Sequence, residues 1–145
     1  MPKGARGYKV ADGRDPEKLK TEVAASFPTL IVQTADRAAA LNESLLEMLA
    51  AQTMRAATSG GLLARKAEID LLLRLGGTTQ ISEAIHQAGA RSGRPFLLIV
   101  AGEEKVLLAL ESGRLALGHR LPRGELSRED LLRVEQAALL NAVRA

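Results

Sequence analysis

The chain is predicted to form one α/β domain, α+β-like, in which several helices cover a small mixed sheet. Its 145 residues suit a single compact unit with one core. Hydrophobic residues make up 46% of the chain, which is ample for such a core. Apolar residues recur at helical spacing in most stretches, and strand-like runs are few. The expected element order is β-α-β-α-α-α-β-α-β-α, rich in helix and short of strand.

The N-terminal elements follow from a few local signals. Residues 1–7 are rich in Gly and basic side chains and are predicted to be a flexible basic arm, with the globular domain over residues 8–145. A short strand is expected at Tyr8–Val10. Asp15 is predicted to cap a helix over 16–26 whose first residue is proline, the position that this residue favours.

Pro28 separates that helix from a strand predicted over 29–34. The next helix is clearest from Asn42 onward, and the Thr-Ser-Gly-Gly run at 58–61 is a loop. The helix carries four apolar side chains at helical spacing: Leu45, Leu46, Leu49 and Ala50.

Two helices joined by a Gly-Gly break occupy 62–89. The first is apolar on more than one side, so we expect it to be covered from two directions. Gly76 and Gly77 end it, and Thr78 or Thr79 is expected to cap the second helix. The second helix has four residues at helical spacing: Ile81, Ala84, Ile85 and Ala88.

The C-terminal third is predicted to begin with a strand over 96–101. This run is continuously apolar, which indicates a central strand covered on both faces. Two adjacent glutamates then open a short helix, and 115–121 is ambiguous but could be an edge strand. Ser127 with Asp130 approximates a capping box and begins a last helix that runs close to Arg144.

Composition restricts the possible functions. The chain has 20 basic and 17 acidic residues, and a weakly basic domain of this kind can bind nucleic acid where its charges cluster. It has no cysteine, which removes disulfides, thiolate chemistry and most structural zinc sites. No apolar run approaches the roughly 20 residues that span a bilayer, and a signal-peptide pattern is absent. We therefore expect a soluble, cytoplasmic protein with no membrane partner.

Catalytic chemistry is weakly indicated. His86 and His119 are far apart in sequence, have no metal-ligand spacing, and are interpreted as ordinary surface histidines. Phosphate-binding loop motifs are absent. We predict no catalytic residue, no metal ligand and no cofactor. A small enzyme remains a rival hypothesis, which requires a deep pocket around one of the two histidines.

The turn at Gly76–Thr79 is a more promising feature. A helix N-terminus presents unpaired backbone N–H groups and positive partial charge, which suit a phosphate or another anion. Hydroxyls of the two threonines and the Gln80 amide could add to such a site. The residues alone favour a plain connection between two helices with a threonine cap.

The same region resembles a known family. Glu68–Leu73, the glycine break, Gln80–Ile85, Gly89 and the strand Phe96–Val100 are similar to the small accessory subunit of the KEOPS complex, the family of PRPK-binding protein (TPRKB). The similarity extends more loosely from about Thr29 to the C-terminus. Abundant Ala and Arg without Cys would suit an archaeal source.

The resemblance implies a non-catalytic subunit that binds the single-stranded 3′ CCA end of tRNA. The complex makes threonylcarbamoyl-adenosine next to the anticodon. Gln80 and Ile81 match the family's Gln-Ile at the helix start, and a basic position before the apolar helix is matched by an Arg-Lys pair. The expected tRNA-binding residues are Arg65, Lys66, Arg74, Thr79, Gln80 and Ile81.

The family's subunit also docks on the N-lobe of a kinase-like ATPase, and the C-terminal helix is apolar over a wide arc. The alternative for this helix is simple packing on the sheet, and both can hold if one face is inward and the other outward. The expected partner-binding residues are Leu131, Leu132, Leu139, Leu140 and Val143.

Two features weaken the RNA interpretation. Thr78 and Thr79 stand where archaeal relatives often carry Lys or Arg, and aromatics are only 2% of the chain, so base stacking would be limited. RNA contact would then rest on backbone amides, aliphatic side chains and spread charge, and would be salt-sensitive. The alternative is a protein-interaction module that regulates the kinase-like partner without RNA contact. Self-association is expected to be possible when the partner is absent.

Overall fold

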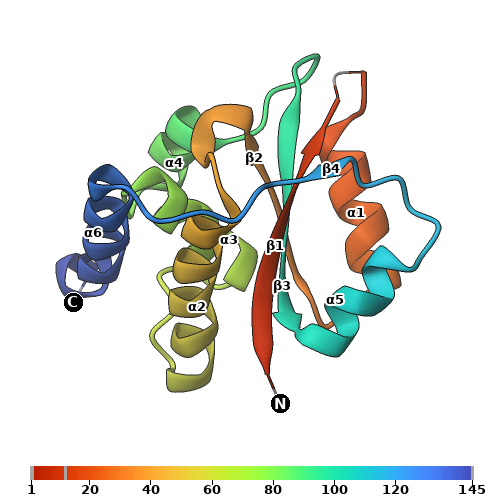
Figure 1. Cartoon of the computed structure of the whole chain (residues 1–145). Helices are drawn as coiled ribbons and strands as arrows, with labels where there is room; N and C mark the ends of the chain where they lie inside the picture. The colour runs from red at the N-terminus through yellow and green to blue at the C-terminus, as the bar shows by residue number, and fades with distance from the viewer. Residues whose placement is uncertain (1, 12, 145) are drawn as a thin grey trace.

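A computed structural model describes residues 2–11 and 13–144 and contains a four-stranded sheet with helices on both faces (Figure 1). The strand order is β2-β3-β1-β4. The strands are β1 (Lys3–Val10), β2 (Ile31–Asp36), β3 (Phe96–Glu103) and β4 (His119–Arg120). The helices are α1 (Pro16–Ser26), the 3₁₀ turn η1 (Arg37–Ala39), α2 (Glu43–Ser59), α3 (Ala67–Gly76), α4 (Ile81–Ala88), α5 (Glu104–Glu111) and α6 (Arg128–Arg144).

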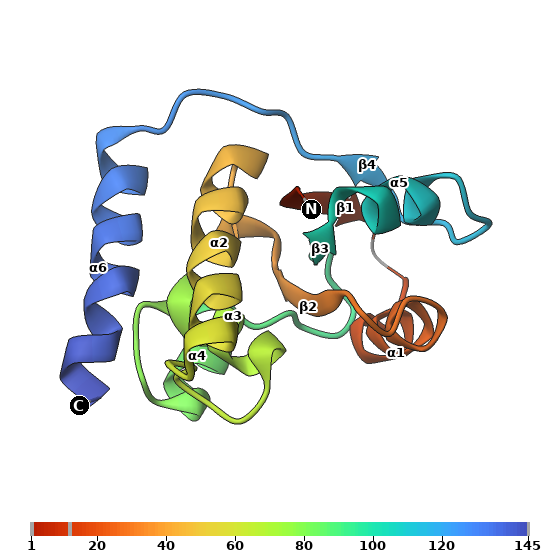
Figure 2. The same ribbon diagram turned by 90° about the horizontal axis from the view of Figure 1, so that it is seen from below.

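The elements form layers. Helices α1 and α5 cover one face of the sheet, while α2, α3 and α4 lie on the other (Figures 1 and 2). Helix α6 packs on α2 and α3 on the side away from the sheet, as an additional outer layer (Figure 2). Side chains alternate between the two faces along β1. Ala5 joins the core under α2, whereas Tyr8 and Val10 join the core under α1 and α5.

The predicted α/β class is confirmed, and the sheet differs from the expected mixed type by being antiparallel throughout. Both neighbours of β3, which are β1 and β2, run opposite to it, and β4 runs opposite to β1. Phe96–Ala101 is fully buried at the centre of the sheet, as its continuous apolar run predicts. Four leucines of α3 are also buried, which agrees with the expected cover from two directions: Leu71, Leu72, Leu73 and Leu75.

The first strand is longer than expected. β1 begins at Lys3, so residues 3–7 lie in the sheet and not in a flexible basic arm, while Met1 lies outside the described residues. The reason is the side chain of Arg6, which is 6% exposed. Its guanidinium lies 2.8 Å from the Glu111 carboxylate and donates to the carbonyl of Leu107.

Three predicted helix starts are confirmed by hydrogen bonds. Asp15 accepts from the N–H of Glu17, and Asn42 accepts from the N–H of Leu45. Ser127 and Asp130 exchange side-chain to backbone hydrogen bonds of 3.0 and 3.2 Å, which is a capping box.

The start of α4 differs from the expectation of a threonine cap. Gln80 occupies the N-cap position, and its side chain makes no capping hydrogen bond. The Thr78 hydroxyl instead accepts from the N–H of Gln80, one residue before the helix. Gly77 ends α3 with φ of 67°, the left-handed conformation that glycine adopts readily.

A long segment after α5 crosses the molecule to reach α6 (Figure 1). Only the two residues of β4 pair with β1, within the span predicted as an ambiguous edge strand. Leu121 donates to the carbonyl of Gly7 at 2.7 Å, and the carbonyl of Pro122 accepts from the N–H of Glu43. The segment is therefore fastened both to the sheet edge and to the first turn of α2.

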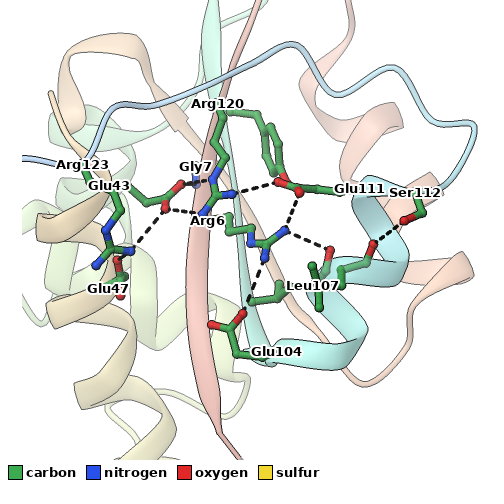
Figure 3. A network of polar contacts seen from close by, with 12 residues as sticks. Arg6, Gly7, Glu43, Glu47, Glu104, Leu107, Glu111, Ser112, Arg120 and Arg123 are labelled. Carbon is green, nitrogen blue, oxygen red and sulfur yellow. Dashed lines mark hydrogen bonds and ion pairs between the residues drawn. The ribbon is translucent and has the colours of Figure 1, made fainter.

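Ion pairs reinforce this attachment (Figure 3). The carboxylate of Glu43 is fully buried and receives two hydrogen bonds from the guanidinium of Arg120, at 2.7 and 2.8 Å. This bidentate hydrogen bonding raises the pKa of Arg120. Glu43 also accepts from the N–H of Gly7, and Arg123 forms ion pairs with Glu43 and Glu47.

Tyr8 joins the same network from the sheet. Its hydroxyl donates to Glu111 at 2.9 Å. Burial, with the nearby Glu111 carboxylate, raises the pKa of Tyr8 to about 12. Burial alone would raise the pKa of Glu111, but the hydrogen bond from Tyr8 and the charges of Arg6 and Arg120 lower it.

Among the described residues, we find no helix that combines the length and apolar character needed to cross a bilayer.

Candidate functional surfaces

Helix α4 presents large apolar side chains to solvent. Ala84 and Ala88 are buried, whereas Ile81 is 48% and Ile85 is 52% exposed. The inner face must be small because α3 and α4 approach closely. A Cβ placed on Gly76 would lie 2.9 Å from the Cα of Ala84. The helical spacing of these residues predicted the stripe, but only the alanines face the core.

The first turn of α4 has both open donors and a local acid. Gln80 and Ile81 are exposed, and Thr79 is half-buried. Because Gln80 gives no side-chain cap, backbone N–H groups of the first turn face outward from the helix end. Glu83 lies in the same turn and accepts from the hydroxyl of Thr78 at 3.3 Å. Its charge partly offsets the positive partial charge of the helix end.

Arg65 and Lys66 are exposed and directly precede α3. The turn at Gly77 lies at the other end of this helix. Since α3 has 10 residues, it spans about 15 Å at 1.5 Å per residue. The basic pair therefore lies one helix length from Gln80 and Ile81, and the fold does not bring the predicted tRNA-binding residues into one cluster.

Arg74 corrects the prediction most clearly, because its side chain is buried and not available to a phosphate. It is 2% exposed, and its guanidinium makes two hydrogen bonds to Asp70, at 2.7 and 3.1 Å. The remaining hydrogen bonds go to Gln52, to the carbonyl of Ala137 and to Asn141. These contacts join α3 to α2 and α6, so Arg74 holds the helical layers together.

A hollow of about 230 Å³ opens beside Arg74, between α2 and α6. It is lined in part by Arg55, Arg74 and Asn141. A guanidinium has five N–H donors, and Arg74 donates five hydrogen bonds within the protein. The hollow therefore offers no free donor from Arg74 to an anion.

Helix α6 is apolar on two opposite sides. Its inner side packs through Val134, Ala137 and Leu140. Leu140 is 6% exposed, so this predicted partner-binding residue is instead part of the packing between helices. The other four predicted partner-binding residues point to solvent and are between 52% and 72% exposed: Leu131, Leu132, Leu139 and Val143. We call these four residues the outer face of α6.

Polar contacts hold the inner side of α6 in place. Gln52 donates to the carbonyl of Val134, and Arg133 donates to the carbonyl of Leu75. Burial lowers the pKa of Arg133. Gln136 donates to the carbonyl of Gly77, so α6 touches the turn from which α4 starts.

His86 and His119 are both exposed. The backbone carbonyl of His86 accepts from Arg91, and His119 lines a shallow hollow near the end of the sheet. Over residues 2–11 and 13–144, no three His, Asp or Glu side chains are grouped closely enough to hold a metal ion.

Sequence reasoning missed the exposure of Ile85. The sequence signal for this exposure was the alternation of large and small apolar side chains along α4. Ala84 and Ala88 are small enough to pass beside Gly76, whereas isoleucine is not, so the isoleucines belong outside.

The fold and these surfaces define a three-layer α/β protein with an additional apolar helix on its outside. In comparisons with known proteins, no family model matches the chain and no curated protein is significantly similar to it.

Proposed function

We propose that the protein is a non-catalytic subunit of a KEOPS-type tRNA-modification assembly in the cytoplasm. It docks on the kinase-like ATPase subunit through the outer face of α6. It contacts the 3′ CCA end of tRNA at the start of α4, and so supports threonylcarbamoyl-adenosine modification. The proposal joins the resemblance described above to two exposed apolar surfaces of the fold.

The outer face of α6 is the observation that carries the docking function. A soluble helix normally has one apolar stripe, which it buries. Here the inner stripe is buried, and Leu132, Leu139 and Val143 form a second stripe at spacings of seven and four residues. Exposed apolar surface of this kind is typical of a protein-interaction site.

The start of α4 supports RNA contact through Ile81. An isoleucine in the first helical turn can contact an unstacked base while backbone N–H groups meet a phosphate. The buried Arg74 and the remote Arg65–Lys66 pair limit charge at this point, so the contact is expected to be weak and salt-sensitive. Thr79 and Gln80 directly precede Ile81 and stay part of the proposed RNA contact.

The docking test uses two matched leucines. Leu139→Glu changes a side chain that is 57% exposed on α6, and Leu108→Glu changes one that is 55% exposed on α5, across the sheet. Affinity for the purified kinase-like ATPase subunit is measured by calorimetry. We expect Leu139→Glu to weaken binding at least tenfold, about 1.4 kcal/mol or more. Equal effects of both variants would refute docking through α6.

The RNA test compares intact tRNA with tRNA that lacks the terminal CCA, at low and at moderate salt. We expect trimming to reduce binding and Ile81→Glu to reproduce the loss, while Leu108→Glu does not. Equal affinity for both RNAs would indicate nonspecific charge attraction.

The alternative is a protein-interaction module that regulates the kinase-like subunit without RNA. Glu83 in the first turn of α4 favours this alternative, since a carboxylate there opposes an incoming phosphate. It predicts salt-insensitive binding to the kinase-like subunit together with no measurable affinity for either RNA.

A further inference from the structure

At one end of the sheet, residues from all four strands lie in one row across it. The register pairs Asp36 of β2 with Phe96 of β3, and Phe96 with Val10 of β1. Lys9 pairs with His119 of β4. Neighbouring strands are about 4.8 Å apart, so this row crosses the sheet over roughly 14 Å. It forms the upper end of the sheet in Figure 1.

Basic side chains gather at this row, around two adjoining hollows. Arg37 and Pro95 line both hollows and so mark the boundary between them. The first hollow, of about 350 Å³, also includes Arg94. The second, of about 220 Å³, also includes Lys9 and His119. Three cationic side chains and His119, from four different segments, therefore line one continuous, indented surface.

Three side chains of this surface carry positive charges that no described carboxylate neutralises. Lys9, Arg37 and Arg94 are exposed, and none of them lies within 4.0 Å of a carboxylate oxygen in the part of the chain that the structure describes. Asp36 lines the first hollow, and its carboxylate accepts from the N–H of Ala38. Within the described residues, these three cations exceed the one acid that lines the hollows, so this surface should attract anions.

The same surface offers apolar contact beside the charges. Leu41 lines the first hollow and is 80% exposed, the highest value among the large apolar side chains that are described. Pro95 lines the same hollow. A ligand that fits both features carries repeated negative charge and flat apolar groups.

An acidic peptide fits this end of the sheet less well. Extended peptides usually bind by adding a strand to an open sheet edge. Gln33 accepts from the N–H of Thr34 and donates to the backbone carbonyl of Glu68 in α3, so this part of the outer edge of β2 is covered. At the other edge, β4 is only two residues long, which is too short to pair well with an added strand.

We propose that this surface, defined by Lys9, Arg37, Leu41, Arg94 and His119, is a binding site for single-stranded nucleic acid. Arg37 and Arg94 contact successive phosphates, since guanidinium groups bind phosphate oxygens in a bidentate manner. An unstacked base rests on Leu41 and Pro95. This site needs neither the acceptor end of tRNA nor Ile81, and it stands independently of the proposed function.

The test measures binding of a fluorescent oligouridine of about 12 nucleotides, a length within the usual footprint of single-strand-binding domains. The oligouridine has no CCA end, so it does not test the proposed CCA contact at the start of α4. Arg37→Ala with Arg94→Ala is compared with Arg55→Ala plus Arg114→Ala, a control pair of exposed arginines that are also unpaired within the described residues. Thermal unfolding verifies that all variants are folded.

Two phosphate contacts contribute about 1.4 to the slope of log affinity against log salt, at 0.7 for each contact with a single strand. We expect the slope of the Arg37–Arg94 variant to be smaller by about this amount, which makes its affinity about 25-fold lower at 0.1 M salt when the two affinities meet at about 1 M. The control pair should change little. Leu41→Ser should weaken binding without changing the slope, whereas Leu108→Ser should have no effect.

Three outcomes would overturn the proposal. No binding by the unmodified protein would remove the site, and equal losses for both arginine pairs would indicate spread charge alone. Polyglutamate that competes as well as the oligonucleotide would show attraction to any polyanion and no preference for nucleic acid.

Discussion

Asp70 and Arg74 form a bidentate ion pair inside the protein, one helical turn apart on α3. Nε of Arg74 lies 2.7 Å from Oδ1 of Asp70, and Nη2 lies 3.1 Å from Oδ2. The side chains are 0% and 1% exposed. Asp70 also accepts from the hydroxyl of Thr53 and from the N–H of Leu63. This pair is therefore the polar centre through which α3 holds α2, the preceding loop and α6.

Arg74→Met should destabilise the fold strongly, because it leaves the Asp70 carboxylate buried without a cation. Loss of one partner of a buried pair typically costs 3–5 kcal/mol, and we expect about that loss in the free energy of unfolding. Urea unfolding followed by circular dichroism measures it. Arg55→Met, on the exposed side of α2, should change stability by less than about 0.5 kcal/mol. A loss as small for Arg74→Met would show that the pair is not important for stability.

The burial of Arg74 could not be predicted from the sequence, although its ion pair could. An arginine near the end of an apolar helix is equally compatible with a phosphate ligand and with an inner tie. The i, i+4 spacing from Asp70 was a usable signal, since such pairs meet on one helix face. Its burial depends on α6, which begins more than fifty residues later in the chain.

Tyr8 should titrate above the usual range. Burial and the Glu111 carboxylate raise its pKa to about 12, from an ordinary value near 10. The chain contains a single tyrosine, so ultraviolet absorbance of phenolate reports this group alone. A midpoint near 10 in the folded protein would contradict the buried hydrogen bond to Glu111.

The same shift predicts a loss of stability at high pH. The folded state holds the Tyr8 proton more tightly than the unfolded state, so this stability is complete below pH 10 and is lost as pH rises towards 12. A rise in the pKa of Tyr8 from 10 to about 12 corresponds to roughly 3 kcal/mol. In Tyr8→Phe, the free energy of unfolding should therefore fall less between pH 9 and 11 than in the unmodified protein.

Gly7→Ala should destabilise the attachment of the crossing segment. A Cβ at this position would overlap with Leu46 of α2 and lie 2.9 Å from Cδ1 of Leu121. Overpacking of this kind costs about 1–3 kcal/mol. Gly124→Ala is a matched control in the same segment, because a Cβ there meets no atom within 4 Å. Equal unfolding midpoints for the two variants would contradict the close packing at Gly7.

The sequence predicted the elements that local chemistry determines. Asp15, Asn42 and the Ser127–Asp130 box each begin a helix through hydrogen bonds within three residues, and all were recognised. The length of β1 was not predicted, because the N-terminal half of this strand is polar and basic. It is ordered by partners more than ninety residues away, such as Glu111, which neutralises Arg6.

The predicted partner-binding residues of α6 were also only partly correct, for the same physical reason. The wide apolar arc indicated that α6 carries partner-binding residues, but which leucine faces inward is set by α2 and α3. Neighbouring positions therefore have opposite roles. Leu140 is 6% exposed, and Leu139 is 57% exposed.

Leu140→Ala and Leu139→Ala should differ sharply in stability although the residues are adjacent. Leu140 packs inward from α6, and removal of a buried leucine side chain costs about 2–5 kcal/mol. Leu139 points to solvent, so its removal should change the free energy of unfolding by less than about 0.5 kcal/mol. Urea unfolding at low protein concentration compares the two variants without self-association.

A large loss for Leu139→Ala that grows with protein concentration would mean that copies of the chain cover the outer face of α6. A large loss independent of concentration would mean that this leucine is buried within the monomer.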